Sequence, residues 1–325
     1  MTILSRLAAA LVIAGASLIA PASAQDFPDR LVRIVVPYPA GGGVDGMARA
    51  LGEGLSQIWK QPVIIENKPG ASTMIGGEFV ARAPADGYTL LLTSDSSITS
   101  NPFLFPNAKF DPVKDFAPIT QLIELNQLVV LHPSVQANSL KELVALSKEK
   151  KGALNYGSYG VGSQPHLLFE MLRAQAGAEL MQIPYRGIAP AITATIAGDV
   201  QMTLGGWSVT AGHIQSGKLK AIAISKKERQ KELPDVPTLK EAGFPDIDPQ
   251  SWFGLFATAG TPKPVIEKIQ KDVAQVFTQP EFQKRLQTLA FEPVASTPDA
   301  FAKFIAEDLA YKKKLIETTG IKGVE

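Results

Sequence analysis

The chain has 325 residues, with 32 basic and 31 acidic side chains, a net charge of +1 and no cysteine. A balanced charge without a basic cluster argues against nucleic acid as a partner. The lack of cysteine excludes disulfides, thiol catalysis and lipid attachment to a cysteine. Because about 300 residues usually exceed what one hydrophobic core serves, we expect two domains.

The first 24 residues have the pattern of a secretory signal peptide. A basic residue precedes an apolar run over residues 7–20, and the sequence Ala-Ser-Ala before Gln25 forms a cleavage site. The run is short for a membrane span and has no stop-transfer flank. We therefore expect cleavage after Ala24 and a mature protein in a bacterial periplasm.

Residues 31–59, LVRIVVPYPAGGGVDGMARALGEGLSQIW, predict a strand, a glycine-rich loop and a helix in succession. A run rich in β-branched residues predicts a buried strand over 31–36, and apolar residues return at helical spacing from Val44. A helix N-terminus carries unpaired N–H groups and a partial positive charge, and glycines let an anion approach the backbone. The loop therefore suits a carboxylate or a phosphate. A tight turn without a ligand would use the same glycines.

The same loop matches the dinucleotide-binding fingerprint. Gly41, Gly43 and Gly46 spell GxGxxG, and Glu66 ends the next expected strand about twenty residues later. An exported oxidoreductase that uses NAD is therefore an alternative. Two features argue against it: residues 37–40 carry the glycines away from the strand tip, and the signal peptide places the protein outside the cytoplasm.

The following segments complete a doubly wound half. Strands are expected over 62–66 and 88–93, with a helix over 74–82 between them. The third strand runs into SDSSITSN, at the carboxyl end of a parallel strand, where open α/β sheets bind ligands. A solvated turn explains the same composition, because Ser and Asn favour turns.

The middle of the chain repeats this arrangement. The extended segment 116–132 could leave one domain and enter another, and a helix is expected over 140–150. The stretch LNYGSYGVGSQPHLLFEMLRAQAG then gives a strand, a Gly and Ser loop, and an amphipathic helix. A second helix start suited to an anion is therefore predicted after the loop 157–163.

Two side chains in the next segments are further candidates for the site. Arg186 follows an expected strand over 181–184 and could bind both oxygens of a carboxylate, although a solvated surface arginine is the alternative. Trp207 follows an expected strand over 200–204. It serves either as an aromatic wall of a cleft or as core, and core is the commoner fate of tryptophan.

The last part of the chain predicts a return to the first domain. Residues 219–225 suggest a further strand, and the extended apolar segment 251–257 could carry the chain back. Thr261 and Thr297 each precede a proline, which predicts two helix N-caps. The amphipathic helices that follow are expected to wrap the first domain.

The sequence contains no recognisable catalytic or metal-binding set. There is no GxSxG, HExxH or P-loop motif, and the three histidines lie far apart. Ser147 and Lys150 match SxxK without its partner motifs. We therefore expect no catalytic residues, no metal and no cofactor.

Five motifs resemble those of one protein family. PYPAGGGVDGMAR, YGSYGVGSQPHL, PYRGIAPA, LPDVPTLKEAGFP and SWFGLFATAGTPKPV occur in the order and spacing seen in solute-binding proteins of tripartite tricarboxylate transporters, often called Bug proteins. The resemblance covers the whole mature chain. It implies an α/β type II periplasmic binding protein, in which two doubly wound domains, joined by two crossover strands near 122–131 and 251–257, close on a small carboxylate.

The resemblance also implies domain limits and ligand-binding residues. Domain 1 would comprise 25–125 and 253–325, and domain 2 would comprise 126–252. The family's ligand loops fall on 38–45, 93–101 and 158–166, followed by the PYRGIAPA motif. The ligand-binding residues expected from these positions, together with the tryptophan considered above, are Tyr38, Ala40, Gly41, Gly42, Gly43, Asp45, Ser94, Ser97, Asn101, Ser158, Ser163, Gln164, His166, Tyr185, Arg186, Ala189 and Trp207.

The implied function is capture of an organic carboxylate by cleft closure and its delivery, by a monomer, to separate membrane permease subunits. Di- and tricarboxylates and aromatic acids such as terephthalate all fit the loops. Many relatives carry an Asp after PYRGIAPA where this chain has Ala194, so one hypothesis is a less polar cleft with a flat acid against Trp207. The other is that both residues belong to the core. A ligand-sensing partner of a membrane receptor is a further alternative.

Overall fold

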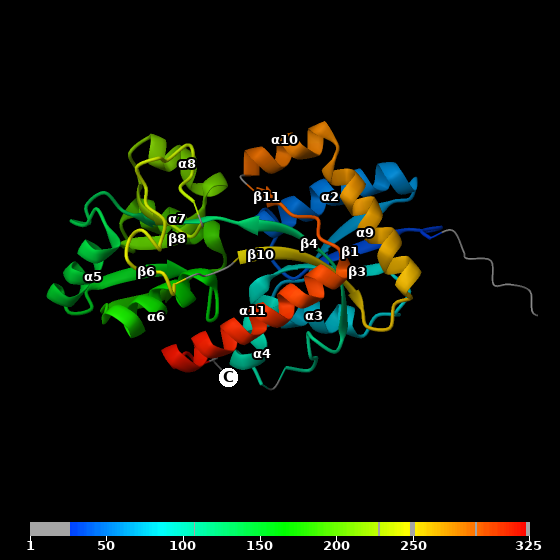
Figure 1. Ribbon diagram of the computed structural model, residues 1–325, viewed down its shortest axis with the longest axis horizontal. Coiled ribbons are helices and arrows are strands. Elements are labelled where there is room, and N and C mark those ends of the chain that lie inside the picture. Colours follow the sequence, from blue (N-terminus) through cyan, green and yellow to red (C-terminus); the bar gives the residue numbers. More distant parts are fainter. Residues whose placement is uncertain (1–26, 107, 227, 248–250, 290, 323–325) are drawn as a thin grey trace, which may run out of the picture.

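The computed structural model describes residues 27–106, 108–226, 228–247, 251–289 and 291–322, so the expected signal peptide lies outside the described residues. The chain forms two α/β lobes, each with helices on both faces of one sheet (Figure 1). The strand order is β11-β4-β10-β3-β1-β2 in the first sheet and β7-β6-β8-β5-β9 in the second.

The first lobe is built from the N-terminal segment and the C-terminal segment of the chain. β1 pairs in parallel with β2 and β3, whereas β10 is antiparallel to β3 and β4. The N-terminal elements are β1 (Val32–Val36), α2 (Gly43–Trp59), β2 (Val63–Asn67), η1 (Ala71–Thr73), α3 (Met74–Ala81), β3 (Thr89–Ser94), η2 (Ser96–Ser100), α4 (Asn101–Leu104) and β4 (Phe116–Leu125). The C-terminal elements are β10 (Ser251–Thr258), α9 (Lys263–Phe277), α10 (Pro280–Leu289), β11 (Phe291–Pro293) and α11 (Pro298–Thr319).

The second lobe is built from the segment between β4 and β10. Its β6 is parallel to β7 and β8, and its β5 is antiparallel to β8 and β9. The elements are β5 (Gln127–Leu131), α5 (Leu140–Glu149), β6 (Leu154–Ser158), α6 (Gln164–Ala176), β7 (Leu180–Pro184), α7 (Ile188–Ala197), β8 (Met202–Gly206), α8 (Trp207–Gln215) and β9 (Lys220–Ile224).

The chain passes between the lobes twice. β4 ends at Leu125 in the first sheet and β5 begins at Gln127 in the second, and the chain returns through β10 from Ser251. The two-lobed architecture with crossovers near 122–131 and 251–257 is therefore confirmed. The residue limits expected for the two domains stay a prediction.

Apolar patterning explains how the helices cover the first sheet. In α2, Met47, Leu51 and Leu55 recur at helical spacing and are fully buried with α9 against one face of the sheet. Alternate strand residues point to the opposite face. There Trp252 of β10 packs with Phe301 of α11.

The C-terminal helix α11 differs from the expectation. Thr297 caps it as predicted, because its side chain accepts from the N–H of Ala300. Its first half packs on the first lobe, but Leu315 and Ile316 belong to the core of the second lobe. The helix therefore spans both lobes instead of wrapping only the first (Figure 1).

Two local expectations also need correction. The N-cap of α9 is Pro262 and not Thr261, whose hydroxyl donates instead to the carbonyl of Thr258. The segment SDSSITSN is neither a turn nor a loop: Ser94 ends β3, and the residues after it form η2 and lead into α4. No helix within the described part of the chain has both the length and the apolar character needed to span a bilayer.

Candidate functional site

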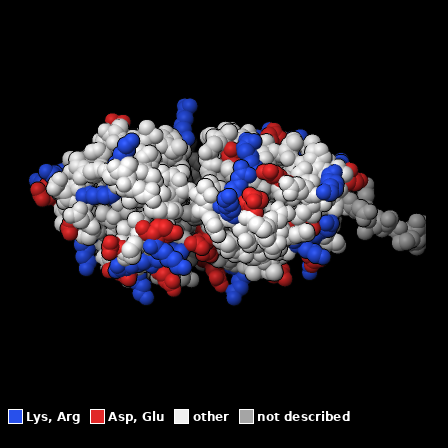
Figure 2. All heavy atoms as spheres, turned by 90° about the horizontal axis from the view of Figure 1, so that it is seen from above, with Lys and Arg blue, Asp and Glu red and all other residues white. Residues whose placement is uncertain are grey.

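A cavity of about 750 Å³ lies between the two lobes. Its position corresponds to the furrow that divides the lobes in the space-filling view (Figure 2). Eight of the expected ligand-binding residues line it. They are Tyr38, Ala40, Gly41, Gly42, Gly43, Ser94, Arg186 and Ala189.

The glycine-rich loop forms part of the cavity wall. Gly41 has φ +88°, a left-handed conformation that favours glycine, and a Cβ there would meet nothing within 4 Å. Gly42 is the N-cap of α2 and has no side chain to satisfy the first N–H groups of the helix. The loop thus presents backbone N–H groups to the cavity at a helix N-terminus.

Four helices begin at this cavity. The N-caps of α2, α3, α7 and α8 all line it, and none of these N-caps makes a side-chain capping hydrogen bond. These N-caps are Gly42 and Thr73 in the first lobe and Gly187 and Gly206 in the second. Because each helix start carries a partial positive charge, the cavity has an electropositive lining contributed equally by the two lobes.

Asp45 holds the glycine loop through a hydrogen bond to its backbone and does not line the cavity. Its carboxylate accepts from the Gly41 N–H at 2.9 Å, from Arg49 at 2.9 and 3.0 Å and from Asn67 at 2.9 Å. Burial alone would raise the pKa of Asp45, but the hydrogen bonds from Arg49, Gly41 and Asn67 outweigh it and lower the pKa. Asp45 therefore stays charged and holds the loop. The sequence had predicted that it contacts the ligand, whereas in the structure it lies outside the cavity lining.

His166 has the corresponding place in the second lobe. Its Nδ1 accepts from the Gly162 N–H at 3.0 Å, and burial lowers the pKa of the imidazole. Ser158 accepts from the Gly160 N–H, and Ser163 donates to the Gly160 carbonyl. These side chains fix the loop from inside and lie away from the cavity.

The expected residues after β3 form a hydroxyl network with the first loop. Tyr38 Oη lies 2.7 Å from Ser94 Oγ and 3.1 Å from Ser97 Oγ. Asn101 donates to the Ser72 carbonyl at 2.6 Å and so ties down another part of the cavity wall. Ser97 and Asn101 support lining residues without lining the cavity.

Arg186 is an exposed side chain at the cavity, as expected, whereas its neighbour Tyr185 is not in the lining. The backbone N–H of Tyr185 donates to the Ser158 carbonyl at 2.7 Å. Trp207 packs against the apolar cluster beneath α7 and α8. Ala194 is buried within α7. Trp207 is outside the cavity lining and its ring is only partly buried, so its position favours the packing role, and a ligand stacked on Trp207 stays a prediction.

Several lining residues were missed by the sequence. Those from the crossover segments could have been found, because a chain that passes between two lobes must run along the cleft between them. Those from β11 and α8 follow from tertiary packing, and their segments gave no strong local signal. Ser251 and Phe253 come from the second crossover segment, Val209 from α8 and Phe291 from β11, whereas Tyr159 falls inside the expected loop 158–166 without having been singled out.

No group of three or more metal-ligating side chains is found in the portion of the chain that the structure covers. The cavity lining contains no Asp or Glu, and Arg186 is its charged side chain among the described residues. The arrangement can therefore bind an anion through backbone N–H groups, hydroxyls and one guanidinium. Among the residues that the structure describes, the lining offers no recognisable set for nucleophilic or metal-assisted chemistry.

A family model described as tripartite tricarboxylate transporter family receptor matches residues 47–321. The chain belongs to this family. The relationship expected from the five motifs is confirmed, and the protein is a periplasmic solute-binding receptor of the Bug type.

Relatives and solved structures agree over nearly the whole chain. BugT of Bordetella pertussis is 32% identical over 313 residues, 96% of each chain. The periplasmic binding protein BugD is 32% identical with a TM-score of 0.83, covering 92% of this chain and 100% of that one. MatC from Rhodopseudomonas palustris, solved with bound malate, is 30% identical with a TM-score of 0.82, covering 89% of this chain and 100% of that one. An R. palustris protein solved with adipate is 28% identical with a TM-score of 0.86, covering 92% of this chain and 100% of that one.

Proposed function

We propose that this receptor captures a small organic carboxylate between its lobes and delivers it to the membrane permease of a tripartite tricarboxylate transporter. The observation that carries the proposal is the convergence of four uncapped helix N-termini, two from each lobe, on one cavity. Charge-assisted hydrogen bonds contribute roughly 1.5 to 3 kcal/mol each, and micromolar affinity requires about 8 kcal/mol. A few such bonds from the two lobes therefore suffice.

The remaining walls favour an acid with a largely apolar carbon skeleton. Phe253 and Phe291 line the first-lobe side, and Val209 lines the second-lobe side. The two phenyl rings are in edge-to-face contact, with their centroids 5.5 Å apart. Extra charges on a ligand would need further cations to offset their desolvation. We therefore favour aliphatic or aromatic mono- and dicarboxylates over highly charged tricarboxylates. The malate and adipate bound to similar proteins are consistent with this class.

The alternative of an NAD oxidoreductase gains no support from the loop. In the dinucleotide fingerprint the acidic residue after the second strand binds a ribose hydroxyl. Here Glu66 pairs with Arg33 at 2.9 Å and Lys68 at 2.6 Å and does not line the cavity. A role as a ligand-sensing partner of a membrane receptor would use the same cleft.

Ligand binding can be tested with the purified mature chain. We expect carboxylic acids to raise its melting temperature, because a ligand at 100 times its dissociation constant stabilises by about 2.7 kcal/mol. The methyl ester of the best acid should bind much more weakly, and Arg186→Gln should lose affinity while Arg229→Gln, on a distant surface, should not. Equal binding of acid and ester, or tight saturable binding of NADH, would overturn the proposal.

Export, oligomeric state and delivery belong to the same proposal. We expect the mature protein to begin at Gln25, which mass spectrometry of periplasmic extract would check, and to behave as a monomer in light scattering. Uptake of the labelled acid by cells should require both this receptor and the permease genes. Uptake that persists without the receptor would contradict delivery.

A further inference from the structure

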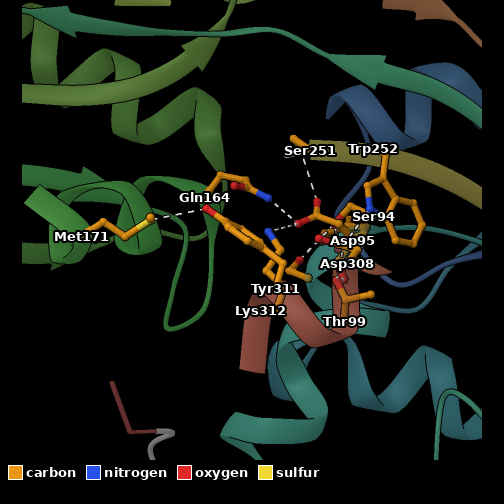
Figure 3. A network of polar contacts seen from close by, with 12 residues as sticks. Ser94, Asp95, Thr99, Gln164, Met171, Ser251, Trp252, Asp308, Tyr311 and Lys312 are labelled. Atoms are coloured by element: carbon orange, nitrogen blue, oxygen red, sulfur yellow. Dashed lines mark hydrogen bonds and ion pairs between the residues drawn. The ribbon is translucent and has the colours of Figure 1, made fainter. Parts of the chain in front are cut away.

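A buried polar cluster connects residues of the two lobes (Figure 3). Asp95 follows β3 in the first lobe, Gln164 begins α6 in the second, and Lys312 lies in α11, which reaches both. Gln164 Nε2 donates to Asp95 Oδ2, and Lys312 Nζ lies 3.3 Å from the same oxygen. All three side chains are at most 1% exposed. One carboxylate therefore connects positions 69 and 217 residues away from it in the chain.

A second carboxylate completes the cluster. Asp308 Oδ2 accepts from the Thr99 hydroxyl at 2.8 Å and from the Trp252 indole N–H at 2.9 Å. Apolar side chains of similar volume would hold a static junction at least as well as buried charges do. The charged groups add a defined geometry to this junction, because a hydrogen-bonded carboxylate fixes both the distance to its partners and the angle at which they approach.

The neighbours of Asp95 belong to the cavity wall. Ser94 precedes it in the chain, and Ser251 Oγ lies 3.5 Å from Asp95 Oδ1; both serines line the cavity. Close to Gln164, Gly162 lies so near the first lobe that a Cβ there would be 2.2 Å from Leu104 Cδ1. A shift at Asp95 therefore changes how the two cavity walls meet.

We propose that Asp95 is a positioning residue that sets the angle between the lobes, through Gln164 on one side and Lys312 on the other. Only the consequence for ligand affinity rests on the proposed function. The angle between the lobes can be measured in the protein without ligand and does not depend on that function. If the binding-competent arrangement falls to about one tenth of the population, the apparent dissociation constant rises about tenfold.

A matched cluster elsewhere provides the control. Asp272 accepts from the Trp59 indole N–H at 2.6 Å and from Lys268 at 2.7 Å, and its side chain is buried. All three residues lie within the first lobe. Asp272→Ala should therefore disturb packing comparably without changing the arrangement of the lobes.

The experiment measures the distance between spin labels on the two lobes. The sequence has no cysteine, so Gln215→Cys and Lys284→Cys place labels specifically on α8 and α10, which contact each other across the cleft. Both positions are exposed. The labelled chain is compared without ligand in the parent, Asp95→Ala, Asp95→Asn and Asp272→Ala forms, and calorimetry gives the affinity for the best carboxylic acid.

We expect Asp95→Ala to shift and broaden the distance distribution and to weaken binding about tenfold. Asp95→Asn retains an acceptor oxygen and should restore the parent distances, and Asp272→Ala should keep them. If Asp95→Ala does not fold, Gln164→Leu removes only the second-lobe arm and should broaden the distribution in the same way. Parent distances in Asp95→Ala, or equal broadening in Asp272→Ala, would overturn the proposal. A parent that binds no acid would refute the proposed function and leave the distance result intact.

Discussion

The two loops before α2 and α6 are closed by the same hydrogen bond made with different side chains. In the first lobe the Gly41 N–H donates to Asp45 Oδ2 at 2.9 Å, and in the second the Gly162 N–H donates to His166 Nδ1 at 3.0 Å. Both glycines have positive φ, +88° and +76°. In each case the acceptor lies four residues on, in the first turn of a helix. The two lobes thus reach one geometry by separate chemical means.

The difference lies in what surrounds each acceptor. Asp45 is a charged group with compensating bonds from Arg49 and Asn67, and its pKa is lowered. His166 accepts as a neutral imidazole in a buried site, and its pKa is lowered by that burial. Space differs too, because a Cβ on Gly162 would meet Leu104 whereas a Cβ on Gly41 would meet nothing. The first loop is open and electrostatically fixed, while the second is tightly packed.

The largest expected effect separates the two glycines. Alanine in the left-handed region costs about 1 to 2 kcal/mol at either position. At Gly162 the contact with Leu104, 2.2 Å from the new Cβ, adds overpacking, so Gly162→Ala should lose about 4 kcal/mol of unfolding free energy in total. Gly41→Ala should lose only the strain. Denaturant unfolding measures both, and equal losses would show that the loops are packed alike.

The second effect tests the charge at the first loop. Asp45→Ala leaves the Gly41 N–H, Arg49 and Asn67 without their acceptor, and should cost about 3 kcal/mol. Glu78→Ala is the control, because Glu78 and Arg82 form a more exposed i,i+4 pair at 2.6 Å, worth about 0.5 kcal/mol. Similar losses in the two variants would mean that Asp45 acts only as a surface ion pair.

The strand and helix pattern around these loops was readable from the sequence, but the roles within them were not. β-branched runs and helical spacing predicted β1, α2 and the second strand–loop–helix unit because local side-chain periodicity decides them. The roles of Asp45 and Trp207 depend on partners brought close by folding. Asn67, for example, lies 22 residues from Asp45. No local pattern contains such a contact.

Lys312 shows the same limit in a single residue. It stands in a run of three lysines, of which it alone is fully buried. A signal was present, because Asp308 and Lys312 follow Phe301 and Ile305 at spacings of three and four residues, along the apolar side of α11. Two charged residues in an apolar stripe indicate either a helix end or a buried ion pair. Only the position of α11 across both lobes distinguishes these possibilities.

A smaller effect is the pH response of the second loop. The pKa of His166 in the folded chain lies below its ordinary 6.5, so the unfolded chain binds the proton first, and the unfolding free energy falls as pH falls through and below 6.5. His166→Asn keeps an acceptor and cannot titrate, so we expect it to flatten the profile of unfolding free energy between pH 7 and 5. The first loop should not respond in this range. The pKa of Asp45 in the folded chain is lowered, so the stability that this carboxylate contributes is lost only when pH falls below its ordinary pKa of 3.8.

Asp95 titrates in the same range with the opposite sign. Burial is the main cause that raises its pKa to about 6, with Lys312 opposing and Asp308 adding to the rise. Tyr159, also beside this carboxylate, stays neutral because its own pKa is raised. The folded chain therefore takes up the proton first, and this contribution stabilises as pH falls below about 6. The pH contributions of His166 and Asp95 are separated by introducing His166→Asn both into the parent and into the Asp95→Asn variant. A profile of unfolding free energy against pH that His166→Asn leaves unchanged would contradict the role of the imidazole.

The smallest effect concerns the third glycine of the GxGxxG pattern in the first loop. In a dinucleotide-binding unit this glycine permits close packing of the helix on the strand, so a side chain there is not tolerated. Here Gly46 lies within α2, and a Cβ on it would meet nothing within 4 Å. Alanine replaces a poor helix former by the best one, so Gly46→Ala should raise the unfolding free energy by about 0.5 kcal/mol and leave acid binding unchanged. A loss of stability or of binding would mean that α2 needs the glycine for close approach, as a dinucleotide site would require.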